Sequence, residues 1–103
     1  MSAYDVAISV RNALAIPDVA KWASTWSYAY ADQSGAQHLI NNHNRILPQG
    51  PNQYVGATGF KTGFTRLAGN TLSATATRNG RTMIVIVMDT ADTYGWTAQY
   101  LDE

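Results

Sequence analysis

The order of apolar and polar residues predicts two short helices at the start of the chain. Ser2 and Asp5 have the spacing of a capping box, and the apolar residues that follow keep a helical period to about Ala15. Pro17 suits the first turn of a second helix, which we expect to end near Ser24. The chain therefore begins with two consecutive helices.

Alternation with a period of two predicts strands in the middle of the chain. Residues 25–32 alternate in this way, and residues 37–40 form a short return strand after a turn at residues 33–36. The aromatic residues of the first strand are Trp26, Tyr28 and Tyr30. We interpret this stripe as a sheet face that packs on a neighbouring helix, with a carbohydrate-binding platform as the alternative.

A polar segment rich in asparagine follows, and it predicts a loop rather than the interior of an element. This loop covers residues 41–45, and Ile46 and Leu47 are expected to anchor it in the core. Residues 48–52 form a turn-rich connector, after which we expect a strand from Gln53 onward.

The second half of the chain predicts an antiparallel hairpin and a last helix. Asn79 and Gly80 separate two strand patterns, which is the signature of a tight turn. Residues 83–88 are apolar on both faces, so we expect the central strand of the sheet there. Residues 90–92 offer N-caps for the helix. Its apolar residues, expected on one side, are Trp96, Tyr100 and Leu101. The fold class is therefore α+β, an antiparallel sheet flanked by helices.

Composition narrows the functional classes. The chain has 103 residues, which is one domain or part of one, and a hydrophobic fraction of 46% that can form a core. Its net charge is zero and its basic residues are scattered, which argues against a nucleic-acid surface. The absence of cysteine excludes disulfides and thiolate metal sites. Met1 starts no signal-peptide pattern, so an export signal would have to lie upstream.

Candidate chemistry lies in the tripeptide Lys61-Thr62-Gly63, which sits within a strand pattern. Lys61 is one of only two lysines and supplies a fixed positive charge. The Thr62 hydroxyl can donate to a carboxylate or relay a proton, and the glycine allows close approach to the backbone. The structural alternative is a lysine that protects an edge strand from aggregation.

Four segments of the chain carry a resemblance to a known family. They are Ser2–Ala7, Asn42–Leu47, Gly59–Thr65, and Asn79–Arg81 with Met83–Met88. In this order they resemble the C-terminal half of the catalytic domain of D-alanyl-D-alanine carboxypeptidases, low-molecular-mass penicillin-binding proteins that are serine peptidases. The third segment is similar to the family's Gly-x-Lys-Thr-Gly-x-Thr strand. The resemblance implies that residues 1–103 form a single, incomplete domain with a β-lactamase/penicillin-binding-protein-like fold.

The resemblance also implies a mechanism and a role for each strand residue. A lysine-activated serine attacks the terminal D-Ala-D-Ala bond, an acyl-enzyme forms, and D-alanine leaves. Lys61 would position the substrate and polarise the hydroxyls, Thr62 would hydrogen-bond the substrate carboxylate, and Gly63 would leave room for the peptide as an added strand. The N–H of Phe64 would be an oxyanion-hole donor, and Thr65 would line the same edge.

Some positions depart from the family pattern. Thr58 stands where the family usually has aspartate, and Trp96 where many members carry an arginine near the substrate carboxylate. The residues three positions before Lys21 and Lys61 are not serine, so the nucleophile motif Ser-x-x-Lys is absent, and the Ser-x-Asn motif is absent too. We therefore interpret the chain as a fragment of the enzyme that is inactive alone.

The expected partners follow from this interpretation. They are a peptidoglycan stem peptide ending in D-Ala-D-Ala, β-lactams and the remainder of the catalytic domain, in the extracytoplasmic envelope of a bacterium. No cofactor, metal or nucleic acid is expected. The alternatives are a non-catalytic module of the same fold that binds peptide or cell wall, and a β-lactamase or esterase relative. Because the remainder would cover part of the sheet, we expect exposed apolar surface and self-association.

The other polar residues are given structural roles. His38 and His43 have no nearby carboxylate in sequence and are not expected to bind metal. Asn42 and Asn44 are expected to hold their loop through side-chain-to-backbone hydrogen bonds. Arg78, beside the tight turn, is expected to be solvated.

Overall fold

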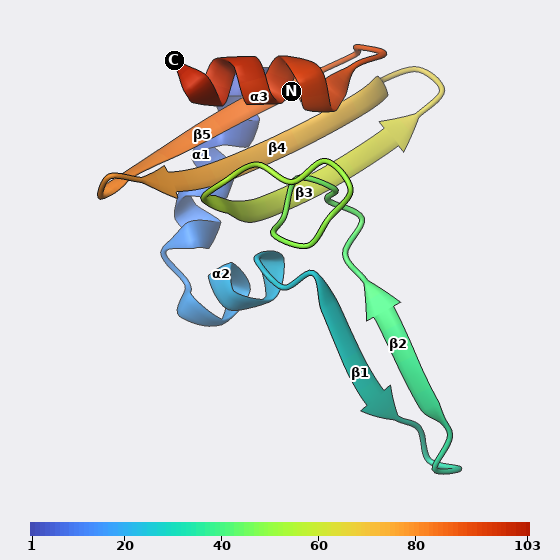
Figure 1. Cartoon of the computed structure of the whole chain (residues 1–103). Helices are drawn as coiled ribbons and strands as arrows, with labels where there is room; N and C mark the ends of the chain where they lie inside the picture. Colours follow the sequence, from blue (N-terminus) through green and yellow to red (C-terminus); the bar gives the residue numbers. More distant parts are fainter.

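A computed structural model describes residues 1–103 and has the expected α+β class (Figure 1). The elements are α1 (Ala3–Leu14), α2 (Pro17–Ala23), β1 (Ser27–Ala31), β2 (Gln37–Asn41), β3 (Ala57–Thr65), β4 (Gly69–Arg78), β5 (Arg81–Met88) and α3 (Thr93–Asp102). Strands β3, β4 and β5 form a three-stranded antiparallel sheet, and β1 and β2 form a separate hairpin. None of the three helices is long and apolar enough to span a membrane.

The helices begin where their capping residues predict. The Ser2 hydroxyl accepts a hydrogen bond from the Asp5 N–H at 3.2 Å, and the Asp5 carboxylate accepts one from the Ser2 N–H at 2.9 Å. The hydrogen bonds that the Asp5 carboxylate accepts from the Ser2 N–H and from the Ser2 hydroxyl lower the pKa of that carboxyl below its ordinary value. Pro17 occupies the first turn of α2, and Asp92 caps α3 by accepting from the Gly95 N–H at 3.0 Å. The predicted helix starts are confirmed.

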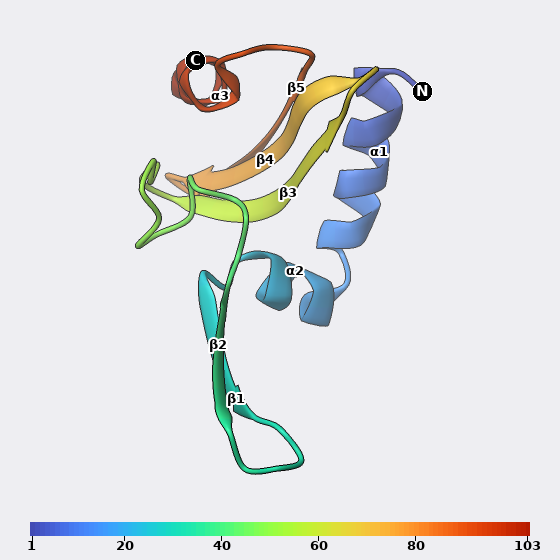
Figure 2. The same ribbon diagram turned by 90° about the vertical axis from the view of Figure 1, so that its right-hand side faces the viewer.

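Strand order corrects one prediction about the sheet. Strand β4, not β5, is central, and β5 lies at an edge. Strand β5 is nevertheless apolar on both faces because α1 packs on one face and α3 on the other (Figure 2). The tight turn between β4 and β5 is confirmed, with Asn79 at a φ of 54° and Gly80 at 74°.

Strand β3 begins at Ala57, so the prediction of a strand from Gln53 is wrong. The backbone of Asn52 and Tyr54 bonds to residues 45 and 46 instead of to the sheet. The Asn52 N–H donates to the Arg45 carbonyl at 2.9 Å, and the Tyr54 N–H donates to the Ile46 carbonyl at 2.8 Å. These bonds fold residues 45–54 into a compact loop.

The core lies between the sheet and α3. Its buried residues are Ile46, Ala57, Leu72, Ala74, Ala76 and Leu101. Only 13 of the 103 residues are buried, and large apolar side chains such as Trp22 and Leu39 stay exposed, so the expectation of exposed apolar surface is confirmed. On α3 the buried residues are Thr97 and Leu101, whereas Trp96 stacks on Tyr100 at 6.0 Å and both are 45% exposed. The prediction that Trp96, Tyr100 and Leu101 share one apolar side is therefore wrong in part.

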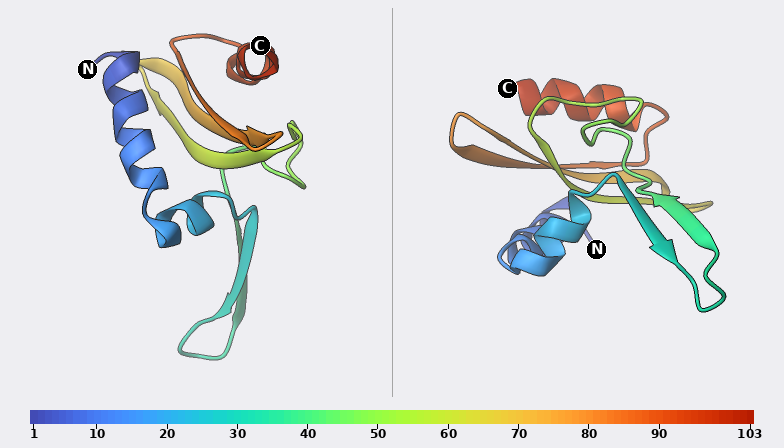
Figure 3. Two further views of the ribbon diagram at one scale, coloured as in Figure 1. Left: turned by 90° about the vertical axis from the view of Figure 1, so that its left-hand side faces the viewer. Right: turned by 60° about the horizontal axis from the view of Figure 1, so that its bottom comes forward.

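The β1–β2 hairpin stands away from the rest of the molecule (Figures 1 and 3). Every residue of both strands is exposed, so the interpretation of the aromatic stripe as a face packed on a helix is wrong for Tyr28 and Tyr30. Trp26 precedes β1 and is half-buried. The side chains of the hairpin pack on one another, with Tyr30 stacked between Tyr28 and His38. Asp32 accepts hydrogen bonds from Ser34 and His38, which lowers the pKa of its carboxyl to about 2.

Candidate functional site

The Lys61-Thr62-Gly63 tripeptide lies on β3, the edge strand opposite β5. Only β4 pairs with β3, so alternate N–H and C=O groups along the outer edge have no strand partner. Lys61 lies opposite Ser73 in the register, and Gly63 lies opposite Thr71. An extended peptide could therefore pair along this edge without displacing part of the sheet.

A cleft of about 400 Å³ opens at this strand. Four parts of the chain line it: the asparagine-rich loop, β3, β4 and the start of α3. The lining residues are His43, Lys61, Thr62, Gly63, Phe64, Asn70, Thr71, Thr93 and Tyr94. The four predicted residues Lys61, Thr62, Gly63 and Phe64 thus meet in one cleft, whereas Thr65 lies on the same strand but outside the lining.

Lys61 is exposed and has no carboxylate partner. Its Nζ donates to the Thr62 carbonyl at 2.6 Å, and both ion pairs of the molecule involve other residues. The cleft lining also contains no aspartate or glutamate. The ammonium group is therefore available to a negatively charged group of a ligand.

The residue opposite Gly63 in the sheet leaves little room for a side chain at this position. A Cβ built on Gly63 would meet Thr71 Oγ1 at 2.7 Å, closer than side-chain carbons approach such atoms. Thr71 Oγ1 donates a hydrogen bond to the Gly63 carbonyl at 3.1 Å, which holds it in this position. In this chain the glycine thus allows the Thr71 side chain to lie close to the β3 backbone.

The asparagine-rich loop is fixed by its own side chains, as predicted. Asn42 Nδ2 donates to the Thr25 carbonyl at 3.1 Å, and Asn42 Oδ1 accepts from the Asn44 N–H at 2.9 Å. Asn44 is completely buried and accepts from the Ile46 N–H at 3.3 Å. The Tyr94 hydroxyl of α3 donates to the His43 carbonyl at 3.3 Å. The loop therefore holds its place at the cleft through both α3 and the base of the hairpin.

Uncharged residues occupy the two positions that depart from the family pattern. Thr58 Oγ1 lies 2.8 Å from Thr75 Oγ1, and Thr75 is completely buried. Trp96 is absent from the cleft lining, to which α3 contributes Thr93 and Tyr94. Neither Thr58 nor Trp96 therefore supplies a charged group to the cleft.

The histidines and Arg78 differ in part from their expected surroundings. His38 does have a carboxylate partner, with Nε2 2.7 Å from Asp32 Oδ2, but it lies on the hairpin and His43 lies in the cleft. No group of three acidic or histidine side chains could hold a metal ion. Arg78 is not simply solvated: its Nη1 donates to the Tyr54 hydroxyl at 2.8 Å, and that hydroxyl donates to Asp102 at 2.7 Å. Burial and the Asp102 carboxylate raise the pKa of Tyr54.

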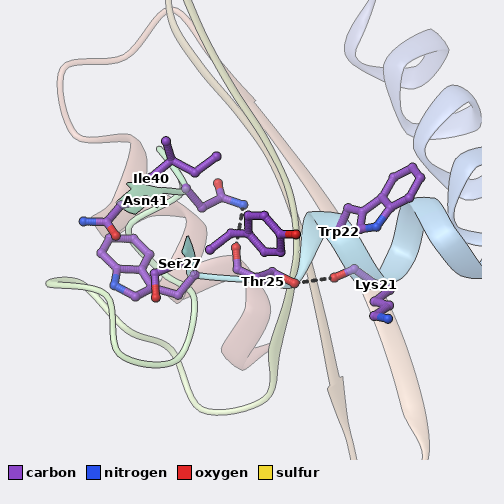
Figure 4. A pocket seen from close by; sticks show the side chains of 9 residues that line it. Lys21, Trp22, Thr25, Ser27, Ile40 and Asn41 are labelled. Carbon is purple, nitrogen blue, oxygen red and sulfur yellow. Dashed lines mark hydrogen bonds between the residues drawn. The ribbon is translucent and has the colours of Figure 1, made fainter. Parts of the chain in front are cut away.

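A larger cleft of about 660 Å³ lies beside the aromatic stripe. It lies between α2 and the base of the hairpin, with Lys21 and Trp22 on the α2 side and Ile40 and Asn41 on the hairpin side (Figure 4). It shares no lining residue with the Lys61 cleft. The signal in the sequence was the aromatic stripe, because Trp26 and Tyr28, two residues of the alternative binding platform, line this cleft.

The chain is similar in sequence to known proteins. The family model of D-alanyl-D-alanine carboxypeptidases matches residues 1–92. The D-alanyl-D-alanine carboxypeptidase DacB2 of Mycobacterium tuberculosis is 33% identical over 87 residues, which are 84% of this chain and 28% of that protein.

Two solved structures also resemble the chain. A peptidoglycan synthesis regulatory factor (PBP3) of Streptococcus pneumoniae has a TM-score of 0.85 and 30% identity, over 99% of this chain and 32% of that one. A D-alanyl-D-alanine carboxypeptidase of Mycobacterium tuberculosis has a TM-score of 0.77 and 28% identity, over 90% of this chain and 36% of that one. The chain spans about a third of the length of these relatives.

Proposed function

The chain belongs to the D-alanyl-D-alanine carboxypeptidase family, and from this membership we propose that it forms the substrate-binding strand of a serine-type D-Ala-D-Ala carboxypeptidase. The reaction would remove the terminal D-alanine of a peptidoglycan stem peptide through an acyl-enzyme, and the same site would bind β-lactams. The proposed place of action is the bacterial cell envelope. The observation that carries the proposal is the Lys-Thr-Gly tripeptide on a free sheet edge beside an acid-free cleft.

The proposed roles follow the geometry of β3. The stem peptide pairs along the outer edge of the strand, where main-chain hydrogen bonds supply affinity. Lys61 gives up its bond to the Thr62 carbonyl and meets the negative charge of the substrate, and the Thr62 hydroxyl donates to the terminal carboxylate. The Phe64 N–H serves as an oxyanion-hole donor, and Thr65 lines the same edge.

The attacking serine has to come from outside these 103 residues, because they contain no Ser-x-x-Lys motif. The second oxyanion-hole donor, the N–H of that serine, is then missing from the chain as well. We therefore expect the chain alone to bind substrate weakly and to release no D-alanine. Sequencing the coding DNA upstream of Met1 tests this: Ser-x-x-Lys and then Ser-x-Asn in frame support the proposal.

A titration of the labelled chain tests the binding strand directly. Acetyl-D-Ala-D-Ala at millimolar concentration is expected to shift the backbone amide signals of Thr62 to Thr65 in NMR spectra. Acetyl-L-Ala-L-Ala provides the matched control ligand, and the amides of the remote β1–β2 hairpin provide the internal control. Flat curves at β3, or equal shifts with both stereoisomers, would contradict the proposal.

The alternative from another class is a non-catalytic module that binds peptide or cell-wall fragments through the same edge. Both proposals predict binding, and neither predicts covalent labelling of the isolated chain by penicillin, so the upstream coding sequence distinguishes them. A covalent mass increase on the isolated chain would contradict both proposals, because it would show that a nucleophile lies within the chain. A β-lactamase or esterase relative would instead hydrolyse a β-lactam or an ester once the serine-bearing part is present.

A further inference from the structure

The larger cleft, between α2 and the base of the hairpin, is lined by aromatic rings that have little contact with the rest of the chain. Its volume of about 660 Å³ lies within the range of about 300–1,000 Å³ that is common for ligand sites. The three aromatic residues of the lining are Trp22, Trp26 and Tyr28. Trp22 is 66% exposed and Tyr28 is 61% exposed, so most of the surface of these two residues is open to a ligand.

Polar side chains without partners line the same cleft. The side chains of Lys21, Ser27 and Asn41 take part in no hydrogen bond or ion pair of the chain, and no aspartate or glutamate belongs to the lining. Aromatic faces stack on the C–H faces of sugar rings, whereas amides, hydroxyls and ammonium groups form hydrogen bonds with sugar hydroxyl and acetamido groups. Exposed rings beside free polar groups therefore favour a carbohydrate ligand.

The two walls of this cleft are held together before any ligand arrives. At the end of α2 the Thr25 hydroxyl donates to the Lys21 carbonyl at 2.8 Å (Figure 4). Asn42, the first residue after β2, connects the two walls. Its N–H donates to the Trp26 carbonyl at 2.6 Å, and its Nδ2 donates to the Thr25 carbonyl at 3.1 Å. A ligand therefore does not have to order the cleft first, and less binding energy is lost to entropy.

We propose that this cleft binds a glycan strand of N-acetylated amino sugars, with its aromatic rings stacked on the sugar faces. The inference rests on the function proposed above, because the stem peptide of peptidoglycan is attached to such a strand. Asn42 lines this cleft, and the next residue, His43, lines the Lys61 cleft. Consecutive residues of the asparagine-rich loop thus serve the glycan and the stem peptide of one substrate.

An NMR titration of the chain with the tetramer of N-acetylglucosamine tests the site. The chain has three tryptophans, and each gives one indole N–H signal. The signals of Trp22 and Trp26 are expected to shift, whereas Trp96, on α3 and outside this cleft, provides the internal control. Maltotetraose, which has no acetamido groups, is the matched control ligand and is expected to bind about fivefold more weakly, because at least one hydrogen bond is lost.

Variants at two tryptophans locate the binding. Trp22→Ala is expected to weaken binding of the tetramer about tenfold, because a stacking ring is removed, and Trp22→Phe is expected to restore most of the affinity. Trp96→Phe is expected to bind like the parent. Because Trp22 is largely exposed, we expect its replacement to preserve the fold, and unchanged amide signals of β3 verify this.

The outcomes separate this inference from the proposed function. No shift at Trp22 and Trp26, equal affinity for the two tetramers, or affinity unchanged by Trp22→Ala overturns the glycan site. The proposed function then still stands, because the titration of β3 with acetyl-D-Ala-D-Ala probes the other cleft. Binding of the N-acetylglucosamine tetramer at Trp22 together with flat curves at β3 supports the glycan site and overturns the proposed function.

Discussion

Replacing Gly63 with alanine tests which neighbour the glycine of the Lys-Thr-Gly strand accommodates. The new Cβ would lie 2.7 Å from Thr71 Oγ1, and ordinary contact begins at 3.4 Å. No other atom outside the adjacent residues lies within 4 Å. The Thr71 side chain therefore has to rotate, which breaks its 3.1 Å hydrogen bond to the Gly63 carbonyl.

The change in the free energy of unfolding can be added up from the interactions that are lost or gained. Loss of the hydrogen bond costs about 1 kcal/mol, and an off-rotamer side chain about 0.5 kcal/mol more. Removing glycine from a strand interior returns about 0.5 kcal/mol. Gly63→Ala should thus destabilise by about 1 kcal/mol, and Thr71→Ala alone by about 1 kcal/mol. In the double variant the clash is gone, so its cost falls to about 0.5 kcal/mol, and the coupling between the two sites is about 1.5 kcal/mol.

Urea unfolding followed by circular dichroism, at one low protein concentration for all four proteins, measures this cycle. Additivity within about 0.3–0.5 kcal/mol would refute the reasoning, because it would show that the two residues do not constrain each other. The peptide titration then separates structure from function. If Gly63 is needed only to leave room for Thr71, the double variant binds acetyl-D-Ala-D-Ala like the parent. If Gly63 is needed to leave room for the substrate, the double variant loses binding although most of its stability is restored.

Two predictions concern the hairpin turns. Gly80→Ala should destabilise the β4–β5 turn by about 1–2 kcal/mol, because Gly80 has a φ of 74°; an unchanged thermal midpoint would show that the turn adapts. Ser34→Ala should raise the pKa of Asp32 from about 2 toward its ordinary value, because Ser34 is the main donor to that carboxylate. A carbon NMR titration of the carboxyl group measures this shift. Because folding lowers this pKa, the contribution of Asp32 to turn stability is present above pH 3.8 and is lost as the pH falls through about 2; turn amides that stay ordered below that range would contradict it.

Local chemistry explains which elements could be predicted from the sequence. The capping bonds of Ser2 and Asp92 and the turn at Asn79 and Gly80 each depend on residues within three positions of one another. Such signals do not need knowledge of the rest of the fold. The helix starts and the tight hairpin were therefore predicted correctly.

Features that depend on distant segments could not be predicted in the same way. The apolar pattern of β5 is the same whether strands or helices surround it, so its edge position was missed. The exposure of the β1–β2 hairpin depends on which other segments pack against it, and the alternation of residues within its strands gives no information about that.

The same distinction between local and distant signals applies to the residues of the candidate site. The tripeptide at Lys61 was found because its residues are adjacent in sequence. The contribution of His43 and Tyr94 to the cleft was missed, because they come from a loop and a helix that meet only in the folded chain. The steric constraint that Thr71 places on Gly63 was also missed, because it depends on the register that pairs these two residues across the sheet.

The packing of both terminal helices on β5 sets the order in which the chain can close during synthesis. The sheet pairings join strands that follow one another, and each needs only a short loop to close. Helix α1 precedes all three strands of this sheet in the chain, yet most of its contacts with the sheet are to β5, the last of the three to be made. The packing of α1 on the sheet is therefore completed only after β5 has been made, and until then the helix lacks most of the sheet surface that it covers.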